Sequence, residues 1–489
     1  MNVFKIARGV LAKYEKLNLP MKASLWFMIC SVLQKGISII TMPIFTRLMS
    51  TEEYGEYNIF LTWYNILLLI VTLNIHTEIF NKGLIDNDTE KDIYTTNQVG
   101  LLIFLTVVFL LLYVFFHQWV NQILGLSSPL VVIMILEILG SAVVALWTAR
   151  KRFDYEYKKI VAVTIGMAIL TQGSGIVAVV FLEDKVSAKI YTNALIPIAV
   201  SVIILFVFVK KSNSLGRLYW WKSAVLSALP LLPHYLSLVL LNQSDKLLIN
   251  HFVGADKAAI YSVAHSAGLL MTIVNNSING SFVPWAYGKM KYEKGNGIKS
   301  VSNSLFTLIM VVNVALIWVA PEAIRLLAAP QYSEAVYCLV PIAMSVYFYF
   351  VYTLFVDMEI YYGANRYVAV ASVVAAALNL IINYLLIPQY GYYIAGYATL
   401  FSYFVTMVLH MLFLRRIMKK NKKRLTELFD INGITRNGAL LVFISIIALL
   451  LYRAPVIRYL TIMGCILFLF AKKRFIYAII SKLRRGKCE

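Results

Sequence analysis

Charged side chains stand inside long apolar stretches of this sequence, where an ionisable group is a candidate functional residue. Lys35 lies near the middle of an apolar run from Leu25 to Phe45, and Asp245 lies inside another such run. A lysine at the centre of a bilayer costs at least ~2.5 kcal/mol, so a compensating ligand or partner is expected. The Lys35 ammonium can bind an anionic ligand, or it can form an internal ion pair with Asp245.

Three amide side chains, Gln34, Asn74 and Asn242, lie in or near the apolar runs, where they can hydrogen-bond to a polar ligand. Amides inside transmembrane helices also hydrogen-bond to neighbouring helices, and that use is the commoner one. We predict Lys35 and these three amides as substrate-binding residues, with helix packing as the alternative for the amides.

Arg47 lies at the start of the segment TRLMSTEEYGEYN (46–58), where an apolar run ends. Its side chain can anchor the helix at the level of the lipid headgroups. Alternatively, it can close an outer gate through Glu52 or Glu53. We predict Arg47 as a gate or coupling residue.

Asp245 and Glu78 complete the predicted gate or coupling residues. A protonatable carboxylate near the outer end of a span can couple substrate release to proton entry. A closed-state gate pair of Asp245 with Lys35 or Lys246 is an equal alternative. Glu359, near a span end, is expected to contact solvent or lipid headgroups.

The elements that position these residues are membrane spans. The chain has 489 residues, of which 60% are hydrophobic and 14% charged, and its mean hydropathy is +0.74. This composition leaves too little polar surface for a soluble globule. Fourteen apolar runs are each long enough to cross a bilayer. They are centred on Lys35, Leu67, Val108, Leu139, Leu170, Val200, Ser237, Leu270, Met310, Ser345, Leu378, Val405, Ser445 and Gly464.

Basic residues fix the expected orientation. Most of the 45 lysines and arginines fall on alternate connections and on both chain ends, so the positive-inside rule places both termini in the cytoplasm. This distribution accounts for the net charge of +21 without a nucleic-acid partner. The basic segment 1–22 has helical amphipathic spacing and is expected to lie on anionic membrane lipids.

An internal repeat organises the spans. Shifting the chain by 204 residues superposes segment 46–58 on segment 250–262, and it pairs Tyr57 with Tyr261. The same offset is expected to carry the third to sixth spans onto the ninth to twelfth without a gap. We predict an all-α polytopic membrane protein with two six-helix bundles in parallel repeat and two extra C-terminal helices. The predicted boundaries are 1–22 (interfacial), 23–210 and 223–414 (lobes), 415–436 (linker), 437–471 (extra helices) and 472–489 (tail).

Four segments resemble the Wzx-type oligosaccharide flippases. They are PIFTRLMSTEEYGEYN (43–58), LPLLPHYLSLVLLNQSDKLLI (229–249), GADKAAIYSVAH (254–265) and FVPWAYGKMK (282–291). These flippases share a superfamily with the lipid II flippase and the MATE multidrug exporters. The likeness covers the twelve repeated spans, and the two extra spans leave the nearest subfamily open.

The resemblance implies two bundles that rock around a central cavity in the bacterial cytoplasmic membrane. It implies transport of an undecaprenyl-diphosphate-linked oligosaccharide to the outer leaflet for O-antigen, capsule or exopolysaccharide assembly. With such a substrate, Lys35 is expected to bind the diphosphate as a point charge, and Gln34, Asn74 and Asn242 to bind sugar hydroxyls. A polysaccharide polymerase and glycosyltransferases are then the expected protein partners. The alternatives are a MATE-like exporter of organic cations and a lipid II flippase.

An enzymatic function is not expected. The longest outer connection, 117–128, is too short for a catalytic domain. The acidic pair in DNDTEKD (86–92) lies in a short polar connection, where a solvated charge run is the better explanation. Four scattered cysteines lack metal-ligand spacing, so we predict no cofactor and no metal.

Overall fold

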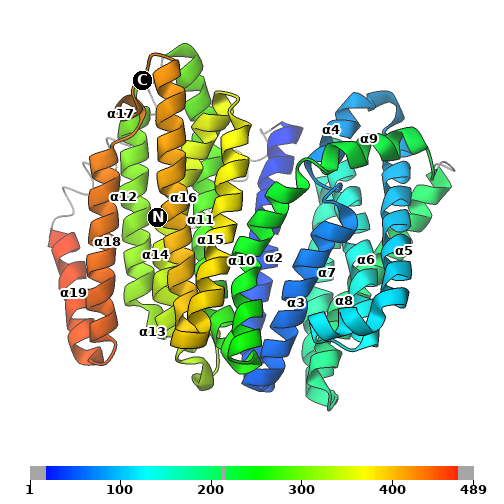
Figure 1. Ribbon diagram of the computed structural model, residues 1–489, viewed down its shortest axis with the longest axis horizontal. Coiled ribbons are helices and arrows are strands. Elements are labelled where there is room, and N and C mark those ends of the chain that lie inside the picture. The colour runs from blue at the N-terminus through cyan, green and yellow to red at the C-terminus, as the bar shows by residue number, and fades with distance from the viewer. Residues whose placement is uncertain (1–17, 212–214, 294, 472–489) are drawn as a thin grey trace, which may run out of the picture. The chain divides into compact units, whose positions relative to one another are not determined.

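The computed structural model describes residues 18–211, 215–293 and 295–471. Of the predicted interfacial segment 1–22, residues 1–17 lie outside the described residues and residues 19–22 belong to the first described helix. The basic tail 472–489 lies wholly outside the described residues. Within the described ranges the regular structure is helical and includes no strand, which confirms the predicted all-α class. Figure 1 shows the long helices running side by side within each part of the chain.

The first half of the chain contains eight helices among its described residues. Their bounds are α2 Leu19–Leu48, α3 Thr51–Thr72, α4 Glu78–Asp86, α5 Lys91–Leu124, α6 Ser128–Phe153, α7 Tyr157–Phe181, α8 Lys185–Lys211 and α9 Leu218–Ala228.

The second half continues this pattern. Its described helices are α10 Leu232–Phe252, α11 Ala255–Tyr292, α12 Ile298–Trp318, α13 Ala320–Leu327, α14 Ala335–Tyr361, α15 Asn365–Tyr390, α16 Tyr393–Lys420, α17 Leu425–Leu428, α18 Ile431–Leu451 and α19 Pro455–Ala471.

Every predicted span contains a helix, but not all fourteen meet strict criteria for crossing a bilayer. Eleven described helices are long and apolar enough, or twelve if α9 and α10, which bend by 56° at their junction, form one span. Helix α3 is not among them, since it begins with the polar stretch TEEYGEYN, and α19 has only 17 residues. The protein is therefore a multi-pass membrane protein, and fourteen is an approximate count.

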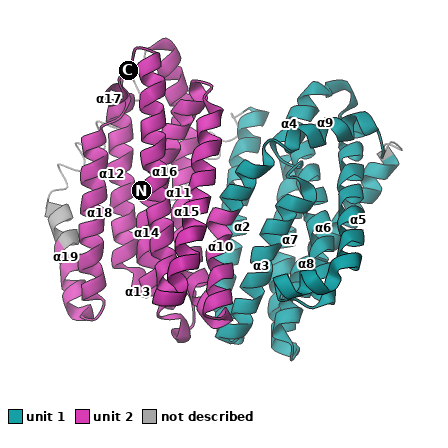
Figure 2. Cartoon of the chain, in the orientation of Figure 1, with its two compact units in different colours: residues 1–239 teal, residues 240–489 magenta. Residues whose placement is uncertain are grey.

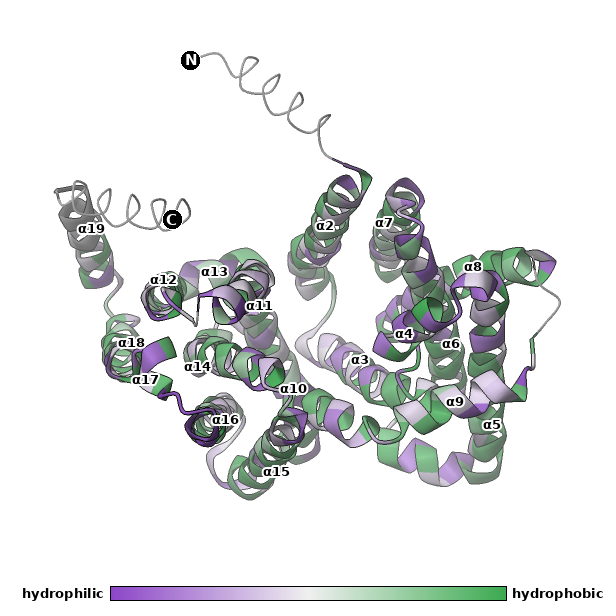
Figure 3. Ribbon diagram, turned by 90° about the horizontal axis from the view of Figure 1, so that it is seen from above, coloured by the Kyte–Doolittle hydropathy of each residue, from purple (hydrophilic) through white to green (hydrophobic). Residues whose placement is uncertain are grey.

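Two compact units divide the chain at residues 239 and 240, inside α10 (Figure 2). In unit 1, α8 packs against α6 and α7, and α2 packs against α7. In unit 2, α14 is central and packs against α11, α12, α16 and α18. Apolar residues predominate along the long helices of both units (Figure 3), and many of their large apolar side chains are exposed, as expected for helices that face lipid.

Local sequence explains where α3 begins. Ser50 accepts a hydrogen bond from the Glu53 backbone N–H, and the Glu53 side chain accepts one from the Ser50 backbone N–H, at 3.1 and 2.7 Å. This capping box satisfies two backbone donors at the helix N-terminus. Glu53 is thus engaged in starting α3.

The repeat is present, with a correction to its register. Helices α3 and α11 start 204 residues apart, whereas the offset is 207 for α5 and α12 and for α6 and α14, and 208 for α7 and α15 and for α8 and α16. The prediction of a gap-free offset is therefore wrong by three or four residues. The chain between the second and third repeated spans is longer in unit 2.

Candidate functional site

Asp245 lies at the centre of a buried polar cluster in unit 2. Its side chain is 2% exposed. The carboxylate accepts hydrogen bonds from Tyr261 Oη at 2.5 Å, Asn383 Nδ2 at 2.6 Å and Thr399 Oγ1 at 2.8 Å. These side chains come from α10, α11, α15 and α16, so the carboxylate joins four helices. Burial of the carboxylate is compensated by these donors.

Asn379 extends this cluster on α15. Its Oδ1 accepts hydrogen bonds from Asn383 at 3.2 Å and from Ser244 at 3.3 Å, and its Nδ2 donates to Thr399 at 3.4 Å. Asn383 Oδ1 makes no hydrogen bond with the described residues. The Asp245 carboxylate can bind a proton. Together with the surrounding amide and hydroxyl oxygens, it also offers the oxygen ligands that a hard cation prefers.

Lys189 is the buried cation of unit 1, and it was not among the predicted site residues. Its side chain is 1% exposed. The ammonium donates to Gln172 Oε1 at 3.1 Å and lies 3.9 Å from the ring centroid of Phe45 and 5.6 Å from that of Tyr57. Thr41 also donates to Gln172 Oε1, at 3.3 Å. A desolvated cation over aromatic faces gains about 2 kcal/mol, which offsets part of the cost of its burial.

The two clusters occupy corresponding places in the repeat. Thr41 corresponds to Asp245 at the 204-residue offset, and Tyr57 corresponds to Tyr261. Each cluster joins the first, second, fifth and sixth repeated helices of its own unit. Lys35, the candidate cation predicted from the sequence, does not belong to the cluster of unit 1. The structure places Lys189 there, because the fifth and sixth helices turn Gln172 and Lys189 inward.

A second buried charge of unit 1 is Glu137 on α6, which is 2% exposed. Its Oε1 accepts a hydrogen bond from Asn193 Nδ2 on α8 at 2.8 Å, and its Oε2 makes none with the described residues. A carboxylate with so few donors is a candidate proton carrier.

The predicted substrate residue Lys35 has an exposed side chain on α2 and no ion pair or hydrogen bond among the residues that the structure describes. Gln34, beside it, donates to the Thr164 carbonyl oxygen of α7 at 3.3 Å. This bond is the helix-packing use that the sequence left open. The Lys35 side chain is thus exposed, whereas the Gln34 amide already joins two helices.

The other two predicted residues differ in which group is engaged. Asn74 adopts a left-handed conformation with φ of 53° in the turn after α3, a conformation that asparagine tolerates better than most residues. Its backbone carbonyl oxygen accepts a hydrogen bond from Thr77 Oγ1 at 2.8 Å. Asn242 Oδ1 on α10 accepts one from Tyr403 Oη at 3.4 Å.

The predicted gate residues Arg47 and Glu78 lie in separate environments within unit 1. Arg47 Nη1 donates to the Pro43 carbonyl oxygen of its own helix at 2.8 Å, and its side chain is exposed. Glu78, in the first turn of α4, accepts a hydrogen bond from Tyr235 Oη at 2.8 Å. Neither of them belongs to the cluster around Lys189.

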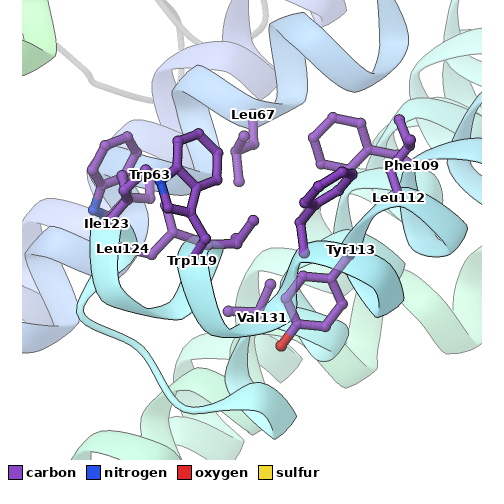
Figure 4. A pocket seen from close by; sticks show the side chains of 11 residues that line it. Trp63, Leu67, Phe109, Leu112, Tyr113, Trp119, Ile123, Leu124 and Val131 are labelled. Carbon is purple, nitrogen blue, oxygen red and sulfur yellow. The ribbon is translucent and has the colours of Figure 1, made fainter.

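An apolar pocket of about 400 Å³ opens in unit 1 between α3, α5 and α6. Figure 4 shows Trp63, Leu67 and Trp119 among the side chains that surround it. Tyr113 Oη donates to Asn121 at 2.9 Å, so the lining offers few groups for a sugar. In the described part of the chain, no group of three histidine, cysteine, aspartate or glutamate residues could hold a metal ion.

Comparisons with known proteins agree with this architecture. A family model described as "Polysaccharide biosynthesis protein" matches residues 21–287. Protein 1 of the Lsg locus of Haemophilus influenzae is 21% identical over 374 residues, covering 73% of this chain and 88% of the relative. These matches confirm the resemblance stated from the sequence.

Two solved structures share the fold. One is a multidrug resistance MATE family transporter of the MOP superfamily in an inward-facing conformation, with a TM-score of 0.61 and 14% identity, covering 80% of this chain and 96% of that chain. The other is the lipid II flippase MurJ in an inward closed conformation, with a TM-score of 0.61 and 11% identity, covering 89% of this chain and all of that chain. At these identities the likeness concerns the fold alone.

Proposed function

Because the chain belongs to the polysaccharide biosynthesis protein family, we propose that it flips an undecaprenyl-diphosphate-linked oligosaccharide across the bacterial cytoplasmic membrane. The family match over residues 21–287 carries this proposal. The saccharide moves from the inner to the outer leaflet by alternating access, and both termini lie in the cytoplasm. Glycosyltransferases supply the lipid-linked unit, and a polysaccharide polymerase consumes it.

Lys35 is the proposed contact for the diphosphate. Its ammonium is exposed on α2 and has no partner among the described residues, and a lysine binds phosphate as a point charge. Asn74 and Asn242 are proposed contacts for sugar hydroxyls, and Gln34 contributes only if its bond to Thr164 opens. Arg47 and Glu78 are proposed gate residues.

Asp245 is the proposed coupling residue. Its carboxylate is buried under three hydrogen-bond donors from three other helices, so binding or loss of a proton changes the contacts of α10, α11, α15 and α16 together. That link between charge and helix packing is what alternating access requires. A sodium ion is the competing ligand, since the cluster is rich in oxygen atoms.

Export of organic cations is a second candidate function, favoured by one observation. Glu137 places a carboxylate inside unit 1, and an exporter of cations needs an acidic group in the first half. Glu137 on α6 and Lys189 on α8 leave unit 1 with both signs of buried charge, which supports the flippase more than the exporter.

The test is transport in liposomes that contain the purified protein and a fluorescent undecaprenyl-diphosphate oligosaccharide. A membrane-impermeant quencher measures the fraction in the outer leaflet, with proton or sodium gradients imposed separately. We expect Lys35→Ala to weaken apparent substrate affinity at least tenfold and Asp245→Asn to abolish the gradient dependence. Lys82→Ala and Asp184→Asn are the controls, since both side chains are exposed outside the long helices.

Three outcomes would overturn the proposal. Transport of an organic cation dye without transport of the lipid would replace it with the exporter. Equal activity of Lys35→Ala and Lys82→Ala would remove Lys35 from the substrate site. A gradient response in Asp245→Asn equal to that of Asp184→Asn would exclude Asp245 from coupling.

A further inference from the structure

Glu359 and His410 form a buried acid–base pair in unit 2, separate from the cluster around Asp245. His410 Nδ1 lies 3.0 Å from Glu359 Oε2, and the two side chains are 1% and 0% exposed. The expectation that Glu359 contacts solvent or headgroups is wrong, because α14 turns this side chain toward α16. A carboxylate and an imidazole therefore share an interior site.

The surroundings of this pair are mostly aromatic. The His410 ring stacks on Tyr352 with centroids 5.5 Å apart and meets Phe413 edge-on at 6.5 Å. Glu359 Oε1 makes no hydrogen bond with the described residues. With a neutral imidazole and an ionised carboxylate the site holds one uncompensated negative charge, and burial of such a charge is unfavourable. Uptake of one proton removes that net charge, whichever partner binds it.

One face of α16 connects this pair to Asp245. Thr399, Tyr403, Thr406 and His410 recur at intervals of three or four residues, so they lie along one side of the helix. Thr399 donates to Asp245 at one end, and His410 contacts Glu359 at the other. The two ends are about 16 Å apart at 1.5 Å per residue.

Aromatic groups fill the distance between the two sites. Tyr403 donates to Asn242 Oδ1 at 3.4 Å, one helical turn before Asp245. The Tyr403 ring lies 6.0 Å from Tyr352, which in turn stacks on His410. Polar and aromatic side chains thus occur at successive helical turns between Asp245 and the pair.

Apart from Asp357, the other titratable groups on the packed helices are engaged elsewhere or exposed. Asp357 is hydrogen-bonded by Asn279 of α11, but its Oδ2 makes no hydrogen bond with the described residues. Its backbone oxygen accepts a hydrogen bond from Tyr287. Lys289 of α11 pairs with Glu293 at 2.6 Å. Tyr347 of α14 donates to the Ile434 carbonyl oxygen of α18, and Tyr349 packs on Tyr352 and Tyr403. At this end of unit 2 the exposed charged side chains are Lys291, Glu293, Lys299, Arg366, Arg415, Arg416, Lys419, Lys420, Lys422, Arg424, Glu427 and Arg436.

We propose that Glu359 and His410 form a second proton-binding site, which receives the proton released by Asp245 and delivers it to the cytoplasm. This inference rests on the proton-coupled form of the proposed function. The proton enters at the Asp245 carboxylate from the outer side, passes along the α16 face and binds the Glu359–His410 pair. It leaves at the end of α14 and α16 that the basic connections place in the cytoplasm.

The first test measures proton binding without transport. Infrared difference spectra of the purified protein between acidic and alkaline pH report the carbonyl band of protonated carboxyl groups. We expect one band to disappear in Glu359→Gln and another in Asp245→Asn, while Glu334→Gln, on a connection outside the long helices, leaves both unchanged. Failure of Glu359→Gln to remove any band would overturn the second site.

The second test measures proton movement in liposomes with an internal pH dye during transport of the lipid-linked saccharide. We expect Glu359→Gln to lower proton uptake per saccharide at least tenfold, and Glu359→Asp, which keeps a carboxyl group, to restore part of it. His410→Gln should shift the pH dependence of transport. Wild-type uptake and pH profile in Glu359→Gln, with only a lower melting temperature, would show a purely structural pair.

The two tests separate failure of this inference from failure of the proposed function. If the wild type moves no lipid-linked saccharide, the proposed function fails, yet the infrared bands still test proton binding at Glu359. If the wild type moves the saccharide and Glu359→Gln behaves as Glu334→Gln does, only the second site is refuted.

Discussion

Replacement of Asp245 by alanine or asparagine separates its structural role from its coupling role. Alanine removes the acceptor of three hydrogen bonds and leaves the donors of Tyr261, Asn383 and Thr399 buried. Side-chain hydrogen bonds between membrane helices contribute about 0.6 kcal/mol on average and about 1.7 at most. Loss of three bonds therefore predicts a destabilisation of about 2 to 5 kcal/mol for Asp245→Ala.

Asparagine keeps the shape of the side chain and one carbonyl oxygen. The hydroxyl groups of Tyr261 and Thr399 can each donate or accept, so one of them can accept from the new amide. We expect Asp245→Asn to cost about 1 kcal/mol. The asparagine side chain cannot bind a proton at physiological pH. The Asp245→Asn variant should therefore transport the saccharide without a response to the proton gradient.

The buried cysteines allow each unit to be measured by itself. Cys338 in unit 2 and Cys30 in unit 1 are 0% and 4% exposed, so a thiol-reactive fluorogenic dye labels them only on unfolding. In a variant whose only cysteine is Cys338, we expect Asp245→Ala to lower the melting temperature well below that of Asp245→Asn. The matched variant that retains Cys30 alone should report a smaller change.

Two results would refute this reasoning. An alanine variant that melts at the wild-type temperature in the Cys338 reporter would show that the three hydrogen bonds do not stabilise unit 2. An asparagine variant with wild-type gradient dependence would show that the carboxylate does not couple.

Three further perturbations test other parts of the chain. Lys189→Met removes a buried charge while keeping an extended side chain. We expect a melting temperature at or above that of the wild type in the Cys30 reporter, and at least tenfold slower transport. Full transport activity would show that the charge is dispensable. Glu156, between α6 and α7, has its pKa lowered to about 2, first by the hydrogen bond from Lys151. Its stabilisation is thus present above the ordinary value of 4.5 and is lost as the pH falls toward 2, so Glu156→Gln should weaken the acid dependence of the melting temperature, and an unaltered dependence would contradict this. A Cβ at Gly100 would clash with the carbonyl oxygen of Leu215; we expect Gly100→Ala to destabilise unit 1 by about 1 to 3 kcal/mol, and wild-type melting would exclude the close contact.

The sequence by itself determined the helical class, the approximate number of spans and the repeat. A membrane span must satisfy its backbone hydrogen bonds internally over about 20 apolar residues, so its signal is local and can be found without tertiary information. The Tyr57 and Tyr261 correspondence follows from the same periodic comparison, and both tyrosines contact the buried charged group of their unit. The motifs at 43–58 and 229–249 likewise predicted the family.

Only the tertiary structure decided which charged groups are buried and with what partners. Helix rotation is set by packing against neighbours, and a span that is apolar on all sides gives no periodic signal for its inward face. The sequence therefore predicts Lys35 as the functional cation, although its side chain is exposed. Lys189 and Glu359 lie close to span ends in the sequence, yet both side chains are buried. Their partners Gln172 and His410 are distant in the chain, and only the packing of α7 on α8 and of α14 on α16 brings each pair together.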